Sequence, residues 1–190
     1  MAEELRTPRA DARRNRARIL AAAETVLARE GAGASVRAVA AAAGVGLGTV
    51  YRHFPTQEAL YQAVAVDRAH RLLGTAATLL RAEDAGAAFF DFFTAVAADA
   101  AREKLVADLV TGAGADRPPG TAEAARALRG TVEALLTRAQ AAGALRADLR
   151  LPEVLALLGA ACLAAERDAW PPALRGRALA VLFDGFRPRS

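Results

Sequence analysis

Residues 35–54, SVRAVAAAAGVGLGTVYRHF, predict two short helices joined by a tight turn. The inner face of the first helix consists of apolar residues at helical spacing, namely Val36, Val39, Ala40 and Ala43. Ser35 is a good N-cap for that helix, and Gly44 supplies the positive φ that a sharp turn requires. Val45 and Val50 are expected to lock the second helix against the first. This is the helix-turn-helix pattern, whose second helix enters the major groove of DNA.

The outward positions of the second helix, residues 47–53, carry groups that suit a nucleic acid. They are Leu47, Gly48, Thr49, Tyr51, Arg52 and His53. Hydroxyl groups, an imidazole and a guanidinium group can bind phosphates and base edges. An ordinary helical hairpin with a glycine turn is the alternative that the spacing alone leaves open, because alanine-rich chains produce many of them.

The positive charge of the chain is concentrated in its first third. The net charge is +4, residues 1–66 carry 9 basic and 6 acidic side chains, and residues 67–190 carry 16 and 15. The basic residues are densest near the N-terminus, at Arg6, Arg9, Arg13, Arg14, Arg16 and Arg18. A basic arm at one end indicates a polyanionic partner such as nucleic acid, and a solvated, frayed terminus is the alternative.

Prolines and glycines separate about nine predicted helices, so the predicted fold is all-α. Alanine makes up about a quarter of the chain, and it favours helices over strands. The predicted helices span residues 11–30, 35–43, 47–53, 56–80, 85–101, 103–111, 121–142, 152–167 and 171–186. We expect residues 1–10 to form a flexible basic arm, residues 11–55 a helix-turn-helix domain, and residues 56–190 a second helical domain.

Residues 19–64, ILAAAETVLAREGAGASVRAVAAAAGVGLGTVYRHFPTQEALYQAV, resemble the N-terminal domain of the TetR (tetracycline-repressor) family of bacterial transcriptional regulators. The match is most specific in residues 44–60. Residues 143–160, GALRADLRLPEVLALLGA, and 174–188, LRGRALAVLFDGFRP, are similar to the SbtR-like branch. The resemblance implies that residues 56–190 form a divergent helical domain that binds an effector and dimerises.

The resemblance also implies roles for single residues. The positions at which the family contacts backbone phosphates and neighbouring bases are Thr49, Tyr51 and His53. Gly48 lies where the lack of a side chain lets the helix approach DNA closely, whereas Leu47 and Arg52 occupy variable positions that tune sequence choice. Arg37, on the preceding helix, can reach a phosphate, and Phe54 is expected to be a core residue.

Further phosphate contacts are implied at the start of the fourth predicted helix. The N-terminus of this helix at Thr56 can offer free N–H groups and its dipole to a phosphate. At the position of Gln57 the family usually has a lysine that contacts phosphate. An uncharged amide there weakens the salt dependence of binding by about one phosphate. Compensation is expected from the basic arm, especially from Arg13, Arg14 and Arg16.

The phenylalanine-rich stretch AAFFDFFTAVAA, residues 87–98, predicts a helix that is buried on several sides. Plain core packing and the wall of an apolar ligand pocket are both open readings. The family places its ligand pocket among the helices from the fourth to the eighth. The candidate pocket residues are Tyr61, His70, Phe89, Phe90, Phe93 and Thr94. No cluster of charged residues marks a strongly charged ligand, so we expect a small hydrophobic or amphipathic effector.

The last two predicted helices are apolar on two faces. Such helices need two neighbours, which are the core of their own chain and the same helices of a second subunit in a four-helix bundle. The candidate interface residues are Val154, Leu155, Leu158, Cys162, Ala178, Val181 and Leu182. We interpret Cys162 as a small buried hydrophobe rather than a redox sensor.

Several classes of protein are excluded by what the sequence lacks. A single cysteine excludes an intrachain disulfide framework and a cysteine-rich zinc site. No nucleophile–base–orienter set and no metal-ligand cluster is present, so we expect no enzyme, no metal and no cofactor. With no signal peptide and no membrane-spanning run, a cytoplasmic location is expected.

The sequence therefore predicts a homodimeric, ligand-responsive repressor of transcription that binds a palindromic operator in double-stranded DNA. The alternative is a constitutive or architectural DNA-binding protein without a small-molecule effector.

Overall fold

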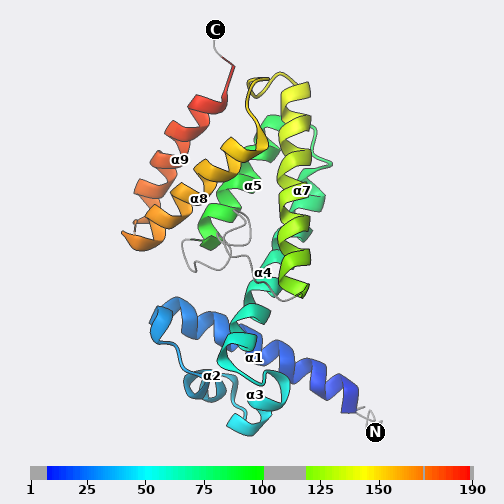
Figure 1. Ribbon diagram of the computed structural model, residues 1–190, viewed down its shortest axis with the longest axis vertical. Helices are drawn as coiled ribbons and strands as arrows, with labels where there is room; N and C mark the ends of the chain where they lie inside the picture. Colours follow the sequence, from blue (N-terminus) through cyan, green and yellow to red (C-terminus); the bar gives the residue numbers. More distant parts are fainter. Residues whose placement is uncertain (1–7, 101–118, 169, 189–190) are drawn as a thin grey trace, which may run out of the picture. The chain divides into compact units, whose positions relative to one another are not determined.

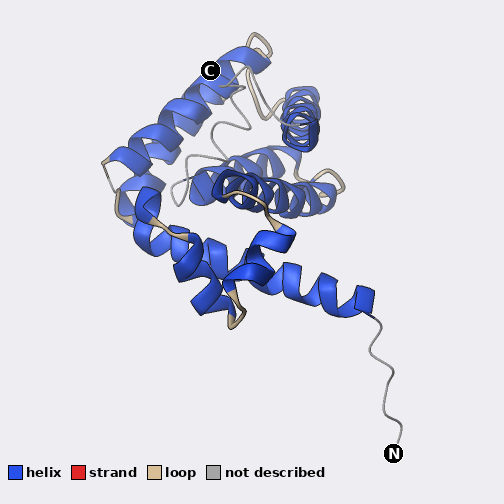
Figure 2. Ribbon diagram, turned by 60° about the horizontal axis from the view of Figure 1, so that its bottom comes forward, coloured by secondary structure: helices blue, strands red, loops and turns tan. Residues whose placement is uncertain are grey.

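A computed structural model describes residues 8–100, 119–168 and 170–188 of the chain. These residues form eight α-helices, and no strand lies among them (Figures 1 and 2). The predicted all-α class is therefore confirmed. The predicted helix over residues 103–111 and residues 1–7 of the predicted arm lie outside the described residues.

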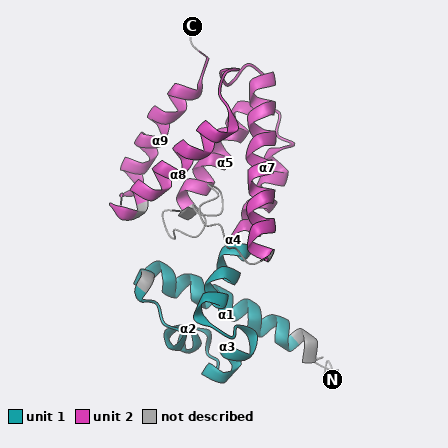
Figure 3. Ribbon diagram, in the orientation of Figure 1, with its two compact units in different colours: residues 1–67 teal, residues 68–190 magenta. Residues whose placement is uncertain are grey.

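The chain divides into two compact units, Met1–Asp67 and Arg68–Ser190 (Figure 3). Helix α4 (Gln57–Leu79) contributes residues to both of them. The sequence placed the domain boundary earlier, after residue 55, where a proline interrupts the helical pattern.

The first unit contains α1 (Pro8–Glu30), α2 (Val36–Ala43), α3 (Leu47–His53) and the beginning of α4. Because α1 begins at Pro8, the last three residues of the predicted flexible arm are helical. Apolar residues from all four helices form one core, and its fully buried members are Ile19, Ala23, Val39, Val50, Leu60 and Val64. This core holds the two short helices in place.

The turn between α2 and α3 has the predicted geometry. The Ser35 side chain accepts a hydrogen bond of 3.1 Å from the Ala38 N–H, so it caps α2. Gly44 ends α2 with a φ of 61°, a left-handed conformation that favours glycine. The Arg18 guanidinium group on α1 donates a 2.7 Å hydrogen bond to the Ala43 carbonyl. This carbonyl lies at the C-terminus of α2, where carbonyl groups lack intrahelical partners and a positive charge is favourable.

The second unit contains the rest of α4 with α5 (Ala85–Ala100), α7 (Pro119–Ala141), α8 (Leu151–Arg167) and α9 (Pro172–Phe186). Helix α5 packs against α7 and α8, and α8 packs against α9. Phenylalanine rings of α5 and α9 form a cluster whose members are Phe89, Phe90, Phe93, Phe183 and Phe186.

The end of α4 is bound to α7 by one side chain of the second unit. The Arg138 guanidinium group donates hydrogen bonds to the carbonyl oxygens of Leu79, at 3.2 Å, and Ala82. These acceptors lie at the C-terminus of α4 and just beyond it, where carbonyl groups lack intrahelical partners and a positive charge is favourable.

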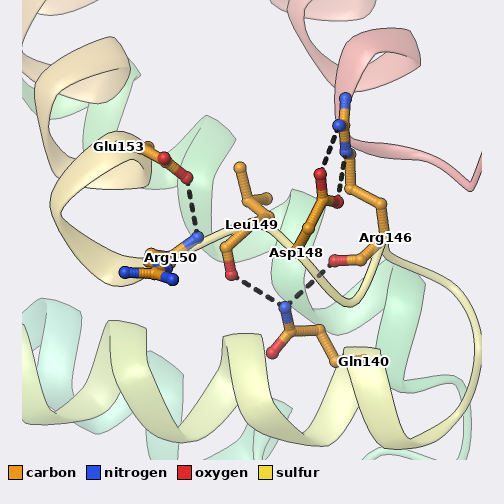
Figure 4. Close-up of polar contacts among 6 residues, drawn as sticks. All are labelled: Gln140, Arg146, Asp148, Leu149, Arg150 and Glu153. Atoms are coloured by element: carbon orange, nitrogen blue, oxygen red, sulfur yellow. Dashed lines mark hydrogen bonds and ion pairs between the residues drawn. The ribbon is translucent and has the colours of Figure 1, made fainter.

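A polar network shapes the connection between α7 and α8 (Figure 4). The Gln140 side-chain amide donates to the carbonyl oxygens of Arg146, at 3.0 Å, and Leu149, at 2.9 Å. The Arg146 side chain pairs with Asp148, and its backbone N–H donates to the Phe186 carbonyl at 2.9 Å. Glu153 accepts from the Arg150 N–H at 2.8 Å, which caps the start of α8. The connection is thereby fastened to the end of α9.

Candidate nucleic-acid interface

Helix α3 has one buried side and one exposed side. Val50 is fully buried in the core of the first unit, as the sequence predicted. The exposed side carries Leu47, which is 36% exposed, Tyr51, which is 46% exposed, and Arg52. Thr49 and His53 are half-buried at the margin. Aromatic, guanidinium and apolar groups therefore face away from the protein.

The glycines at the start of α3 are not required by the fold. Gly46 is the N-cap residue with a φ of −68°, and Gly48 is helical, so neither has a backbone conformation that favours glycine. A Cβ atom added at either position would meet nothing within 4 Å. The protein itself therefore leaves room for side chains at both positions, and none is present.

The residues beside α3 divide into exposed and internally bound groups. Arg37, on α2, is exposed, whereas Phe54 is a core residue, as expected. Thr56 caps α4, because its hydroxyl oxygen accepts a 3.0 Å hydrogen bond from the Ala59 N–H.

Gln57 is bound within the first unit. Its side-chain nitrogen donates to the Ala34 carbonyl at 3.2 Å and to the Tyr61 hydroxyl at 3.0 Å. A side-chain amide has two N–H groups, so no donor is left for a phosphate in this arrangement. Tyr61, predicted as a pocket residue, packs against the core of the first unit and donates to the Ala34 carbonyl at 2.5 Å.

The arginines of α1 have different surroundings. Arg13 is exposed, and Arg14 forms an exposed ion pair with Asp11. The Arg16 guanidinium carbon lies 5.4 Å from the centre of the Phe54 ring, which is within cation–π range. With the Arg18 bond to α2, two of these cations hold the helix-turn-helix together. Neither contact is visible in the sequence, because each joins segments that are distant along the chain.

The remaining candidate residues lie in the second unit. His70 and Thr94 are exposed, and Phe90 is half-buried. Phe89 and Phe93 are buried, and their rings pack on Phe186 at centroid distances of 6.2 and 5.9 Å. These two rings thus fasten α5 to α9.

The predicted interface stripe on α8 faces the chain's own core. Its members are fully or almost fully buried within the second unit, and they are Val154, Leu155, Leu158 and Cys162. They are therefore not exposed to a partner. Burial also raises the pKa of the Cys162 thiol to about 12. The sequence identified the apolar stripe, and the assignment of these residues to a dimer interface stays a prediction.

An apolar groove of about 510 Å³ is lined by residues of α8, α9 and the connection between α7 and α8. Its lining includes Leu157 on α8, and Val181 and Leu182 on α9, with Arg146 and Asp148 among its charged residues. Val181 is 73% exposed, Leu157 is 40% exposed, and Leu182 and Ala178 are half-buried. These residues form part of the exposed apolar surface of the two helices, to which Leu163 on α8 and Leu174 on α9 also belong.

No described helix is both long and apolar enough to span a membrane. The described residues contain no group of three or more histidine, cysteine or acidic side chains that could hold a metal ion.

Two short helices packed across a glycine turn, with the second helix exposing one face, define the first unit as a helix-turn-helix DNA-binding domain. Residues 19–64 match the family model of the bacterial regulatory proteins of the tetR family. Residues 84–188 match that of the C-terminal domain of SbtR-like transcriptional regulators. The chain belongs to the TetR family of transcriptional regulators, in its SbtR-like branch.

Solved structures agree with this assignment. A TetR transcription regulatory protein from Mycobacterium vanbaalenii is 40% identical, with 95% of this chain and 99% of that chain covered and a TM-score of 0.70. A TetR transcriptional regulator from Streptomyces coelicolor is 31% identical, with 92% and 99% covered and a TM-score of 0.70. The regulator FadR from Bacillus subtilis shares the fold at 17% identity, with 90% and 99% covered and a TM-score of 0.64. A comparison with curated proteins gave no match.

Proposed function

We propose that this transcriptional regulator is a homodimeric repressor that binds a palindromic operator and releases it when a small effector binds. The exposed face of α3 carries the proposal, because it presents Leu47, Tyr51 and Arg52 outward while Val50 anchors the helix in the core. A dimer would present two such helices to successive major grooves, roughly 34–36 Å apart along the DNA.

The proposed DNA contacts lie in the first unit. They are Arg13, Arg37, Leu47, Gly48, Thr49, Tyr51, Arg52, His53 and Thr56. The charged residues among them suit phosphates, which supply sequence-independent affinity, and the outward residues of α3 suit base edges. Gln57 is left out of the proposal, because both of its N–H groups are bound within the protein.

The proposed dimer surface is the exposed side of α8 and α9. An exposed apolar groove lined by Leu157, Val181 and Leu182 favours a second copy of the same surface, since symmetric dimers pair identical patches. Ala178 lies on the same helix and is half-buried. A four-helix bundle made by two copies of α8 and α9 would cover these side chains.

The proposed effector is a small hydrophobic or amphipathic molecule. The solved FadR structure from Bacillus subtilis is a complex with stearoyl-CoA, which is a property of that protein. In this chain the second unit is rich in apolar side chains, and we propose a pocket near α5, with His70, Phe90 and Thr94 as candidate lining residues. Because α4 contributes to both units, it is the element through which an effector could act on DNA binding.

The proposal is tested by selection of duplex DNA from a random pool by the purified full chain, followed by gel-shift titration and light scattering. We expect enrichment of a palindromic sequence, and a complex that contains two chains per palindrome or a multiple of two. A chain that enriches no sequence, or that stays monomeric at micromolar concentration with and without DNA, contradicts the proposal. A thermal-shift screen of apolar metabolites then tests the effector, because a ligand that binds only the folded state raises the Tm.

A further inference from the structure

The first turn of α3 presents a single isolated apolar side chain. Leu47 is 36% exposed and lies between Gly46 and Gly48, which have no side chains. The space beside both glycines is open, since an added Cβ atom would meet nothing within 4 Å. Glycine is among the weakest helix formers, so Gly48, which lies inside the helix, is unfavourable there and is not needed by the packing.

This arrangement limits what positions 46–48 can recognise. Glycine has no side chain, and the leucine side chain has no donor or acceptor, so none of these three residues can form a side-chain hydrogen bond with a base edge. The major groove offers one apolar group on the edges of the four bases, which is the C5-methyl group of thymine. Leucine can bury that methyl group, and the flanking glycines leave the space that a close approach needs.

We infer that Leu47 reads the C5-methyl group of one thymine in each operator half-site. The inference rests on the proposed function, in which α3 lies in the major groove, and it adds the chemical group that the first turn selects. Val50 is fully buried and anchors α3 in the core, whereas Leu47 lies at the surface, where 36% of its side chain is exposed. Tyr51 lies one turn further along α3 and is 46% exposed, so its ring could contact the same methyl group. The experiment must therefore distinguish a contact made by Leu47 from one made by Tyr51.

The test uses the duplex that the wild-type chain selects from a random pool. Each thymine of the half-site is replaced in turn by uracil, which lacks only the methyl group, and affinity is measured by fluorescence anisotropy at fixed salt. Loss of one buried methyl group is expected to weaken binding about fourfold in one half-site, and about fifteenfold when both half-sites carry uracil. This arm needs no protein variant, so a folding defect cannot disturb it.

The variants assign the effect to a residue. In Leu47→Ala the thymine and uracil duplexes should bind equally, within about twofold. Leu80→Ala is the matched control, because it removes a half-buried leucine of the second unit that lies outside α8 and α9, and it should keep the preference for thymine. Tyr51→Ala should bind more weakly overall and keep that preference as well.

Three outcomes overturn the inference. The first is a wild-type protein for which no uracil substitution changes affinity. The second is a Leu47→Ala variant that still prefers thymine, and the third is a preference that is lost in Tyr51→Ala instead. A wild-type chain that selects no DNA sequence overturns both the proposed function and this inference. A chain that selects a palindrome but shows one of the three outcomes above overturns this inference alone.

Discussion

The Tyr61 hydroxyl donates a 2.5 Å hydrogen bond to the Ala34 carbonyl, and so joins the start of α4 to the segment just before α2. The Gln57 amide donates to the same carbonyl and to the Tyr61 oxygen. Three polar groups therefore satisfy one another beside the core of the first unit. A residue whose position suggested a phosphate contact, and another whose aromatic ring suggested a ligand pocket, both bind the protein itself.

Removal of the Tyr61 hydroxyl should weaken the first unit. Tyr61→Phe deletes a bond to a partly buried carbonyl, and we expect a loss of about 1 kcal/mol in the free energy of unfolding. Urea denaturation followed by circular dichroism measures this loss. Tyr51→Phe is the matched control, because Tyr51 is 46% exposed, so its hydroxyl is accessible to water and its loss should cost little stability. Equal stabilities of the two variants would contradict the assignment.

Restoring the family's lysine should change the electrostatics of DNA binding. Gln57→Lys adds a positive charge at the start of α4 and removes the two amide bonds. We expect the slope of log affinity against log salt concentration to steepen by about one unit, with some loss of stability. Thr137→Lys, which adds the same charge at an exposed site of the second unit, is the control. A slope that changes equally in both variants would mean that only net charge matters.

Loss of the Arg138 side chain should destabilise the second unit. Arg138→Met keeps the aliphatic stem but leaves the Leu79 and Ala82 carbonyls without their cationic partner. Hydrogen bonds to charged groups are stronger than neutral ones, and we expect a loss of about 2 kcal/mol in unfolding free energy. Arg126→Met, at an exposed position of the same helix, should change stability by less than about 0.5 kcal/mol. Similar losses in the two variants would argue against the role of Arg138.

Two charge substitutions should distinguish residues of the dimer surface from residues of the core by their different effects. Val181→Glu places a carboxylate on a side chain that is 73% exposed, so the chain should remain folded and become monomeric in light scattering. Leu158→Glu buries a carboxylate at a position that is 1% exposed, so it should unfold the second unit. A Val181→Glu protein that remains dimeric would move the interface elsewhere.

The buried thiol of Cys162 should give a pH-dependent contribution to stability. Its pKa is raised by burial from 9.0 to about 12, so the folded state keeps the proton that the unfolded state loses. The contribution is therefore complete below about pH 9 and is lost as pH rises toward 12. Relative to Cys162→Ala, the wild-type free energy of unfolding should fall by about 1.4 kcal/mol between pH 8 and pH 10. Parallel pH curves for the two proteins would contradict a buried, protonated thiol.

Local signals explain what the sequence could predict. Ser35 and Gly44 mark the two ends of α2 through a cap and a turn, and both act within a few residues, so the helix-turn-helix was visible without a structure. The predicted helix ends also agree with those observed to within three residues, apart from the helix outside the described residues.

The contacts that the sequence missed have no local signal. Arg18 reaches a carbonyl 25 residues away, and Tyr61 reaches one 27 residues away. Nothing in either neighbourhood identifies the acceptor. The stripe on α8 shows the same limit, because periodicity reveals that a face is apolar but does not identify the element that covers it. Leu158, for example, is 1% exposed within its own chain.

The open space around Gly46 and Gly48 has an evolutionary consequence. A Cβ atom added at either position meets no neighbouring atom, so alanine there carries no steric penalty within the protein. A duplicated copy of such a regulator can therefore vary the surface that it offers to DNA at these positions without compensating mutations in the core. The same freedom makes positions 46 and 48 the natural place to begin when reprogramming this protein as a switch for a chosen promoter.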